Sequence, residues 1–255
     1  MSDHPLSGIV IAGGRSRRFG TDKRRLRLWG DQGPHLLGHA VDLLKPLCVE
    51  TIVVMNDGAA WSDLPARIVA DEEPGSGALG GLISGLQAMH TPAALVIAAD
   101  MPLIEPALLS ALAHWPFVGD VLAPTDPGAP GSPQPLLAIY RQSALDPLRR
   151  AFAAGERRLQ VVLTTLRWVD PGPELWQQFD PECRSLVNIN TPEDLVTVSR
   201  WLKNLKIAIF AIFLANRVAL DMHASGTEWR DSRESVSLVA PRAISCLSGI
   251  PNQAR

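Results

Sequence analysis

Three continuous apolar runs, rich in β-branched residues, constrain the fold of this chain more than any other feature. They cover residues 7–13 (SGIVIAG), 50–56 (ETIVVMN) and 93–100 (AALVIAAD), with helix-like sequence between them. A strand covered on one face alternates apolar and polar residues, whereas a strand covered by helices on both faces is apolar throughout. The pattern therefore predicts an α/β fold, with a doubly wound, mostly parallel sheet in a three-layer α/β/α sandwich.

Weaker segments extend this alternation along most of the chain. Further strands are predicted at 67–70, 120–124, 135–141 and 185–190. Helices are predicted at 35–47, 79–90, 144–154 and 157–166. A last helix should begin with Thr191 as N-cap, Pro192 at the first helical position and Asp194 completing a capping box.

The sequence changes character near Leu202. Residues 207–215 (IAIFAIFLA) are apolar but fall short of the roughly 20 residues that span a bilayer, and the sequence from there to Arg255 is rich in Ser and Arg without periodicity. We predict one globular domain at 1–202 and a C-terminal appendage at 203–255, formed by an apolar helix and then disordered chain. No transmembrane span is expected.

Charge and cysteine usage exclude several classes of protein. The formal net charge of -2 argues against broad binding to nucleic acid or to anionic membranes. The three cysteines are widely separated, so neither a zinc site nor a disulfide framework is indicated. The N-terminus lacks a basic segment followed by a long apolar run, as a signal peptide would have, and a cytoplasmic location is expected.

A glycine- and arginine-rich loop follows the first predicted strand, in the segment IAGGRSRRFGTDK (11–23). Gly13 and Gly14 allow the backbone N–H groups to approach a ligand closely, and Arg18 and Lys23 are cationic donors suited to a polyphosphate. No Gly-Lys-Ser/Thr ends the loop, so it is not a Walker A motif. The loop predicts a nucleotide site of another kind.

A second glycine pattern allows an alternative. Gly75, Gly77 and Gly80 fit Gly-x-Gly-x-x-Gly, and Asp100 lies 20 residues beyond Gly80, which together resemble a dinucleotide-binding fingerprint. The acidic residues 71–73 precede these glycines, where they would repel a pyrophosphate. We therefore disfavour this alternative.

Asp100 ends the third apolar run and is followed by Met101 and Pro102. A carboxylate at the carboxyl end of a central parallel strand lies where doubly wound folds bind their ligands. With a nucleoside triphosphate as substrate, its expected task is to hold Mg²⁺.

The motifs together resemble those of the molybdenum cofactor guanylyltransferase family. The resemblance covers about residues 7–202. It is carried by Ala12-Gly13-Gly14-x-Ser16-x-Arg18-x-Gly20-x-Asp22-Lys23, Gly77-Ala78-Leu79-Gly80-Gly81-Leu82, Asp100-Met101-Pro102, Gln134-Pro135-Leu136, Gly155-Glu156-Arg157-Arg158 and Asn188-Ile189-Asn190-Thr191-Pro192-Glu193-Asp194-Leu195. Departures are Phe19 in place of a frequent Met, Ala78 in place of a usual Pro, and the extra basic residues Arg24 and Arg25.

The resemblance implies transfer of GMP from GTP to the phosphate of molybdopterin, with GTP and molybdopterin as ligands and Mg²⁺ as cofactor. Arg18, Lys23 and Asp100 would be catalytic, and Asp100 would ligate the metal. The nucleotide would contact Ile11, Ala12, Gly13, Gly14, Lys23, Asn56, Asp71 and Asp100. The acceptor would contact Arg157, Arg158, Asn188 and Asn190.

Other readings stay open at this point. A cytidylyltransferase, or another nucleotidyltransferase acting on a small phosphorylated acceptor, would use the same fold. A non-catalytic nucleotide-binding protein is the alternative from another class, although Lys23 and Asp100 would then be unnecessary. Molybdoenzyme maturation proteins are candidate partners.

Overall fold

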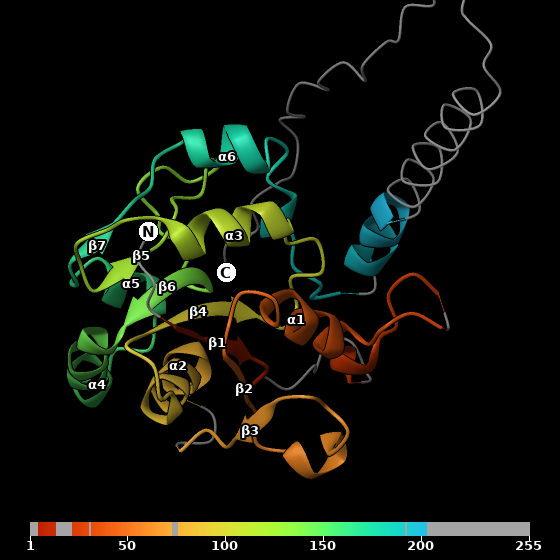
Figure 1. The fold of residues 1–255 in the computed structure, drawn as a ribbon, viewed down its shortest axis with the longest axis horizontal. Coiled ribbons are helices and arrows are strands. Elements are labelled where there is room, and N and C mark those ends of the chain that lie inside the picture. The colour runs from red at the N-terminus through yellow and green to blue at the C-terminus, as the bar shows by residue number, and fades with distance from the viewer. Residues whose placement is uncertain (1–4, 14–21, 31, 73–75, 192, 203–255) are drawn as a thin grey trace, which may run out of the picture. The chain divides into compact units, whose positions relative to one another are not determined.

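The computed structural model describes residues 5–13, 22–30, 32–72, 76–191 and 193–202 (Figure 1). These residues form a sheet of seven strands in the order β3-β2-β1-β4-β6-β5-β7. The strands are β1 (Leu6–Ile11), β2 (Glu50–Val54), β3 (Arg67–Val69), β4 (Ala93–Ala98), β5 (Val121–Leu122), β6 (Leu137–Arg141) and β7 (Trp168–Val169). Strands β1 to β4 are parallel, and β6 is antiparallel to both of its neighbours.

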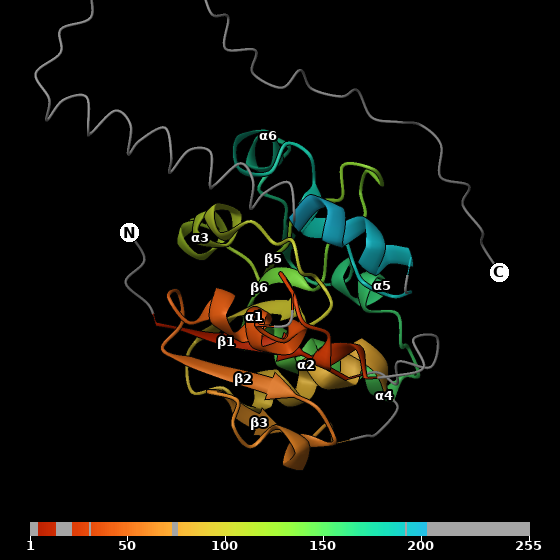
Figure 2. The same cartoon turned by 90° about the vertical axis from the view of Figure 1, so that its right-hand side faces the viewer.

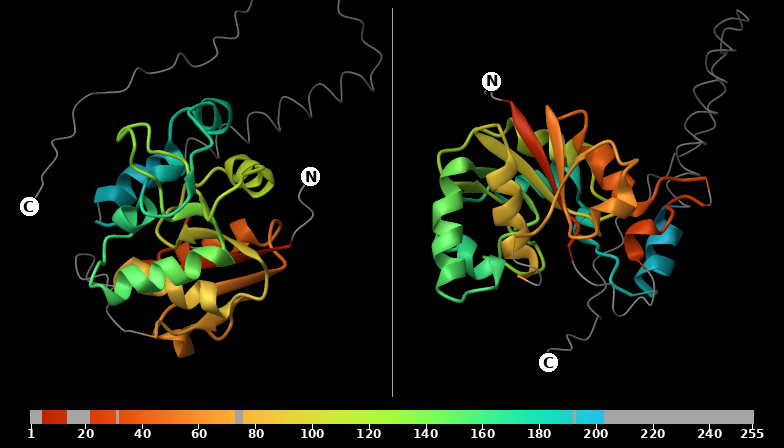
Figure 3. Two further views of the ribbon diagram at one scale, coloured as in Figure 1. Left: turned by 90° about the vertical axis from the view of Figure 1, so that its left-hand side faces the viewer. Right: turned by 90° about the horizontal axis from the view of Figure 1, so that it is seen from below.

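Helices cover both faces of the sheet, as Figures 1 and 2 show. They are α1 (Leu36–Leu44), α2 (Gly77–Ala88), α3 (Pro106–His114), α4 (Leu145–Ala153), α5 (Leu159–Leu163) and α6 (Glu174–Phe179). Residues from α1, α3 and α6 share one hydrophobic core, and residues from α2, α4 and α5 share the other. The predicted three-layer α/β/α sandwich is confirmed, and Figure 3 shows it from two further sides.

The apolar strands supply both cores by simple alternation. On β1, Val10 faces one core while Ile9 and Ile11 face the other, and all three are buried. On the α2 face the approach is close, since a Cβ at Gly85 would lie 2.8 Å from Cγ2 of Ile9. The glycine lets α2 lie directly against β1 and so fixes where its N-terminus starts.

One predicted strand is wrong. Residues 185–190 do not form a strand: Arg184–Leu186 is a 3-10 turn, and the residues after it do not join the sheet. A backbone bond from Ile189 N–H to the carbonyl of Asp100, at 2.9 Å, ties the segment to the end of β4. A strand needs a continuous ladder of such bonds, and β4 already has β1 and β6 as neighbours.

The predicted start of the last helix is confirmed where the structure describes it. Residues 193–202 are helical, Asp194 Oδ2 accepts from the N–H of Thr191 at 2.8 Å, and the N–H of Asp194 donates to Thr191 Oγ1 at 3.3 Å. Pro192 and the appendage 203–255 lie outside the described residues, so the domain boundary at 202 stays a prediction. None of the described helices has the length and apolarity needed to cross a membrane.

Candidate functional site

The candidate site lies at the carboxyl edge of the sheet, where parallel strands end together. The predicted ligand residues follow successive strands: Gly13 follows β1, Asn56 follows β2, Asp71 follows β3 and Asp100 follows β4. The chain passes from β1 to β2 and β3 on one side and returns to β4 on the other. Strand order thus reverses between β1 and β4, and doubly wound sheets usually bind their ligands outside the carboxyl ends of the strands at such a point.

Lys23 is the centre of the polar contacts at this edge. Its Nζ donates to Asp100 Oδ2 and to the carbonyl of Ile189, both at 2.8 Å, and to Asn190 Oδ1 at 3.2 Å. The side chains of Lys23 and Asp100 keep 19% and 24% of their surface exposed, so solvent and ligands reach the pair. The structure thus brings together three residues that the sequence assigned to one site from far-apart motifs.

Arg24 fixes the backbone that carries Lys23. Lys23–Arg25 is the 3-10 helix η1, and Asp22 caps it by accepting from the N–H of Arg24 at 3.1 Å. The Arg24 guanidinium also bonds the carboxylates of Asp22 and Asp57 and approaches the carbonyl of Ala12 at 3.4 Å. The hydrogen bond from Arg24 lowers the pKa of Asp57 below its usual value. Arg24, which appeared in the sequence only as excess charge, therefore joins both flanks of the glycine-rich loop to the end of β2.

A small hydrophobic cluster holds the asparagine segment against this turn. Its buried members are Leu28, Leu36, Ile189, Val198 and Leu202. Ile189 is fully buried, whereas Asn188 and Asn190 on either side are exposed. The two asparagines therefore lie on the exposed side of the segment, and the Asn190 amide oxygen accepts from Lys23.

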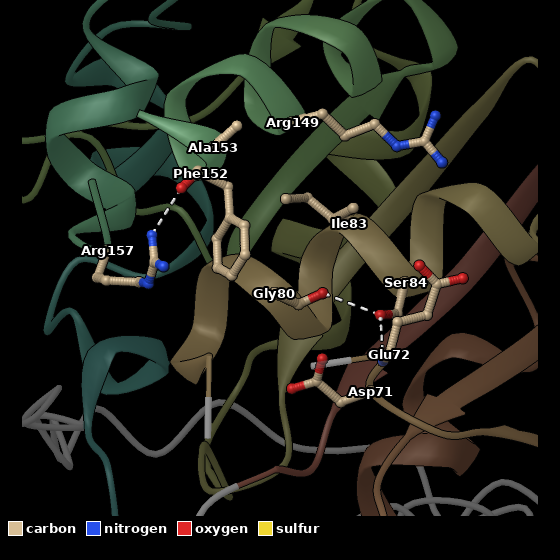
Figure 4. Close-up of a pocket in the computed structure, with 9 residues that line it drawn as sticks. All are labelled: Asp71, Glu72, Gly80, Ile83, Ser84, Arg149, Phe152, Ala153 and Arg157. Atoms are coloured by element: carbon tan, nitrogen blue, oxygen red, sulfur yellow. Dashed lines mark hydrogen bonds between the residues drawn. The ribbon is translucent and has the colours of Figure 1, made fainter. Parts of the chain in front are cut away.

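Asp71 lies in a second polar group. Its N–H donates to Asn56 Oδ1 at 2.8 Å, and its Oδ2 accepts from the Ser76 hydroxyl at 2.7 Å. Asp71 also lines a cavity of about 430 Å³ between α2 and α4, shown in Figure 4. The cavity is lined by Asp71, Glu72, Gly80, Ile83, Ser84, Arg149, Phe152, Ala153 and Arg157.

The structure separates the two arginines of the Gly-Glu-Arg-Arg motif. Arg157 lines the cavity, donates to the carbonyl of Phe152 at 2.7 Å and stacks over the Phe152 ring at 3.8 Å from its centroid. Arg158 instead pairs with Glu156 at 3.0 Å, and its hydrogen bond lowers the pKa of that carboxyl to about 2. Arg157 and Asp71 share one cavity, although the sequence assigned them to different substrates.

His39 supports the Asp-Met-Pro turn from α1. Its Nε2 lies 3.1 Å from the carbonyl oxygen of Pro102, and its ring meets Trp29 edge-on at 4.9 Å between centroids. Burial lowers the pKa of His39, so the neutral imidazole is favoured in the folded chain. The sequence gave no signal for this contact.

Metal-binding capacity rests on few groups. Within the described part of the chain, no three His, Cys, Asp or Glu side chains are grouped to hold a metal ion. Asp100 Oδ2 and Asn190 Oδ1 nevertheless converge on one cation, the Lys23 ammonium. One carboxylate with a neutral oxygen nearby suits Mg²⁺, which keeps waters and takes further ligands from phosphates. Gly14 and Arg18, also predicted for this site, lie outside the described residues.

Comparison with known proteins gives a consistent picture. Residues 8–169 match the model of the MobA-like NTP transferase domain. A probable molybdenum cofactor guanylyltransferase of Chloroflexus aggregans is 73% identical over 197 residues, which are 77% of this chain and 95% of that protein. A molybdenum cofactor guanylyltransferase of Pseudomonas putida is 33% identical over 193 residues, or 75% of this chain and 96% of the relative.

Solved structures agree with these relatives. Molybdopterin-guanine dinucleotide biosynthesis protein A of Archaeoglobus fulgidus superposes with a TM-score of 0.64 at 31% identity, covering 78% of this chain and all of that one. A 2-C-methyl-D-erythritol 4-phosphate cytidylyltransferase of Thermus thermophilus reaches a TM-score of 0.53 at 16% identity, covering 78% of this chain and 99% of its own. The second likeness shows the fold alone.

Proposed function

The chain belongs to the family of MobA-like NTP transferases, and we propose that it transfers GMP from GTP to the phosphate of molybdopterin, releasing pyrophosphate. The observation that carries this proposal is the contact of Lys23 with Asp100 and Asn190 at the end of β4. A cation there, where the strand order reverses between β1 and β4, suits the triphosphate of a nucleotide. The guanylyltransferase relatives supply the choice of base and acceptor.

The reaction needs no nucleophile from the protein. An oxygen of the acceptor phosphate attacks the α-phosphorus of GTP, the new P–O–P bond forms, and the bond from the α-phosphorus to the bridging oxygen breaks. Pyrophosphate leaves with the electron pair. Catalysis then depends on orientation and on neutralising phosphate charge. Lys23 would supply that charge, together with Arg18.

Asp100 would hold Mg²⁺, with the amide oxygen of Asn190 within reach of the same position. The metal, when bound, supplies positive charge that offsets the charge of the phosphates. Lys23 pairs with Asp100, so the lysine lies next to the phosphates that the metal would bring. This argument supports the predicted metal site from the donor groups of the chain itself.

The two substrates would adjoin along the sheet edge. The nucleotide would take the backbone of Ile11–Gly14 together with Asn56 and Asp71, and the acceptor would take Arg157, Arg158, Asn188 and Asn190. Since Asp71 and Arg157 line one cavity, we place the boundary between base and acceptor inside it. Arg157 is the better placed of the two arginines, because Arg158 is paired with Glu156. Delivery of the product to molybdoenzyme maturation proteins, and a cytoplasmic location, stay predictions.

The test is pyrophosphate release with molybdopterin and Mg²⁺ in the presence of GTP, CTP, ATP or UTP in turn, with the product identified by mass. GTP should be strongly preferred. Asp100→Asn should lower the turnover rate by orders of magnitude while leaving the melting temperature close to that of the wild type. A preference for CTP would favour the cytidylyltransferase. Tight GTP binding without any pyrophosphate would favour the non-catalytic nucleotide-binding protein.

A further inference from the structure

Ser76 forms an unusual hydrogen bond at the start of α2. It is the N-cap residue of that helix, and a serine there normally accepts from a backbone N–H in the first turn, a contact of about 1 kcal/mol. Ser76 makes no such capping bond. Its hydroxyl donates to Asp71 Oδ2 at 2.7 Å instead, and the residue is 7% exposed.

The surroundings preserve this contact. A Cβ at Gly80 would lie 1.8 Å from Ser76 Oγ and 3.2 Å from Asp71 Oδ1, so any side chain there would displace the hydroxyl. From the other side, Asn56 Oδ1 accepts from the N–H of Asp71 and anchors its backbone. Asp71 is thus held by two segments of the chain: Asn56 fixes its backbone, and Ser76 at the start of α2 bonds its carboxylate.

The oriented carboxylate faces the cavity between α2 and α4 (Figure 4). An ionised carboxylate has about four acceptor positions, so it can accept from Ser76 and from a ligand at the same time. A guanine base presents two adjacent donors, N1–H and the exocyclic 2-amino group, which a carboxylate accepts as a pair only when its plane is aligned with the base. Free rotation of the side chain would weaken that alignment.

We propose that Ser76 is a specificity-determining positioning residue, which fixes the plane of the Asp71 carboxylate so that it accepts from the paired donors of a 2-amino-6-oxopurine. This inference rests on the proposed role of Asp71 in nucleoside recognition. Ser76 itself does not touch the base. Its removal therefore affects the choice among bases more than the chemical step.

The experiment measures kcat and KM of Ser76→Ala with GTP and with ITP, whose base lacks the 2-amino group. The ratio of the two kcat/KM values does not depend on the fraction of folded enzyme, so partial unfolding cannot imitate the effect. We expect the preference for GTP over ITP to fall about tenfold, mainly through the KM for GTP, as suits the loss of one hydrogen bond to a charged group. Ser7→Ala is the matched control. Ser7 is also buried, and its hydroxyl donates to the carboxylate of Glu50 at 2.7 Å, near the amino end of β1 and away from the carboxyl edge.

Asp71→Asn, alone and combined with Ser76→Ala, separates the role of Asp71 in base recognition from the positioning role of Ser76. If the inference holds, Asp71→Asn lowers the GTP preference and Ser76→Ala adds nothing further in that background. A normal GTP preference in Asp71→Asn would remove Asp71 from base recognition, and the inference with it, without bearing on the transferase activity. A lowered GTP preference in Asp71→Asn with a normal preference in Ser76→Ala would overturn the role of Ser76 but leave that of Asp71. An equal loss of kcat/KM with GTP and ITP in Ser76→Ala would also overturn the role of Ser76.

Discussion

Replacing Lys23 with Met tests the proposed phosphate contact most directly. Met keeps most of the length and apolar volume of the side chain but removes the ammonium that bonds Asp100, Ile189 and Asn190. A unit charge 4 Å from a phosphate oxygen at a protein surface has a gross Coulomb energy of about 4 kcal/mol, and a hydrogen bond to a charged group contributes about 1.5–3 kcal/mol net. We therefore expect GTP affinity or kcat/KM to fall roughly 10- to 150-fold.

The same substitution has a smaller effect on the fold. The Lys23–Asp100 pair is partly exposed, so solvent screens it, and its loss should lower the free energy of unfolding by at most about 1 kcal/mol. The assay combines titration of GTP with initial rates of pyrophosphate release and urea unfolding. Lys45→Met is the control, because Lys45 is exposed at the C-terminus of α1 and the charge change is identical. If Lys23→Met binds and turns over GTP like the control, Lys23 does not contact the triphosphate.

Three further changes probe the acceptor side, the support of the Asp-Met-Pro turn and the chain boundary. Arg157→Ala should raise the KM for molybdopterin by about tenfold and Arg158→Ala by much less, since Arg158 is held by Glu156; equal effects in initial-rate assays would contradict this ranking. The pKa of His39 is lower in the folded chain than in the unfolded chain. Below about pH 6.5 the unfolded chain therefore binds more protons than the folded chain, and the free energy of unfolding decreases as the pH falls through the folded pKa. Urea unfolding should show that the free energy of unfolding decreases less between pH 7.5 and pH 5.5 in His39→Gln than in the wild type. The control His114→Gln, at an exposed site, should behave like the wild type. A chain ending at Leu202 should fold and transfer GMP, as melting temperature and turnover would show; an insoluble or inactive product would place part of 203–255 in the domain.

The sheet could be predicted because its central strands carry a strong signal. The runs at 7–13, 50–56 and 93–100 are apolar on both faces, and each contains a strand between two cores. Strand β7 was missed because two residues at an edge offer no periodicity. Helix α3 was also missed, although Pro106 at its first turn after Glu105 is a recognisable start. The segment 185–190 was wrongly predicted as a strand because apolar and polar residues alternate wherever one side of a segment packs against the core, with or without a ladder of backbone hydrogen bonds.

Residue types predicted the candidate site better than they predicted its contacts. Gly, Lys and Asp after successive strands must meet at one edge of a parallel sheet, so Lys23 and Asp100 could be placed together before any geometry was known. No such rule governs Arg24, which stood out in the sequence only as an extra basic residue but is bound to Asp22 and Asp57. Nor could sequence show that Ser76 bonds Asp71 rather than capping its own helix, because both contacts use the same residue at the same position.

The position of Asn190 shows why the functional unit must extend beyond the sheet. The last strand ends at Val169, and the match to the family model ends there as well. Asn190 nevertheless reaches Lys23, because Ile189 beside it is buried with Val198 and Leu202 from residues 193–202. Removal of that helix would expose Ile189 and release the segment, leaving Lys23 without two of the oxygens that orient it, the Ile189 carbonyl and the Asn190 amide. The helix therefore supports the nucleotide site through this packing and through Asp194, whose carboxylate accepts from the N–H of Asn190 at 2.8 Å, so the shortest active chain must include it.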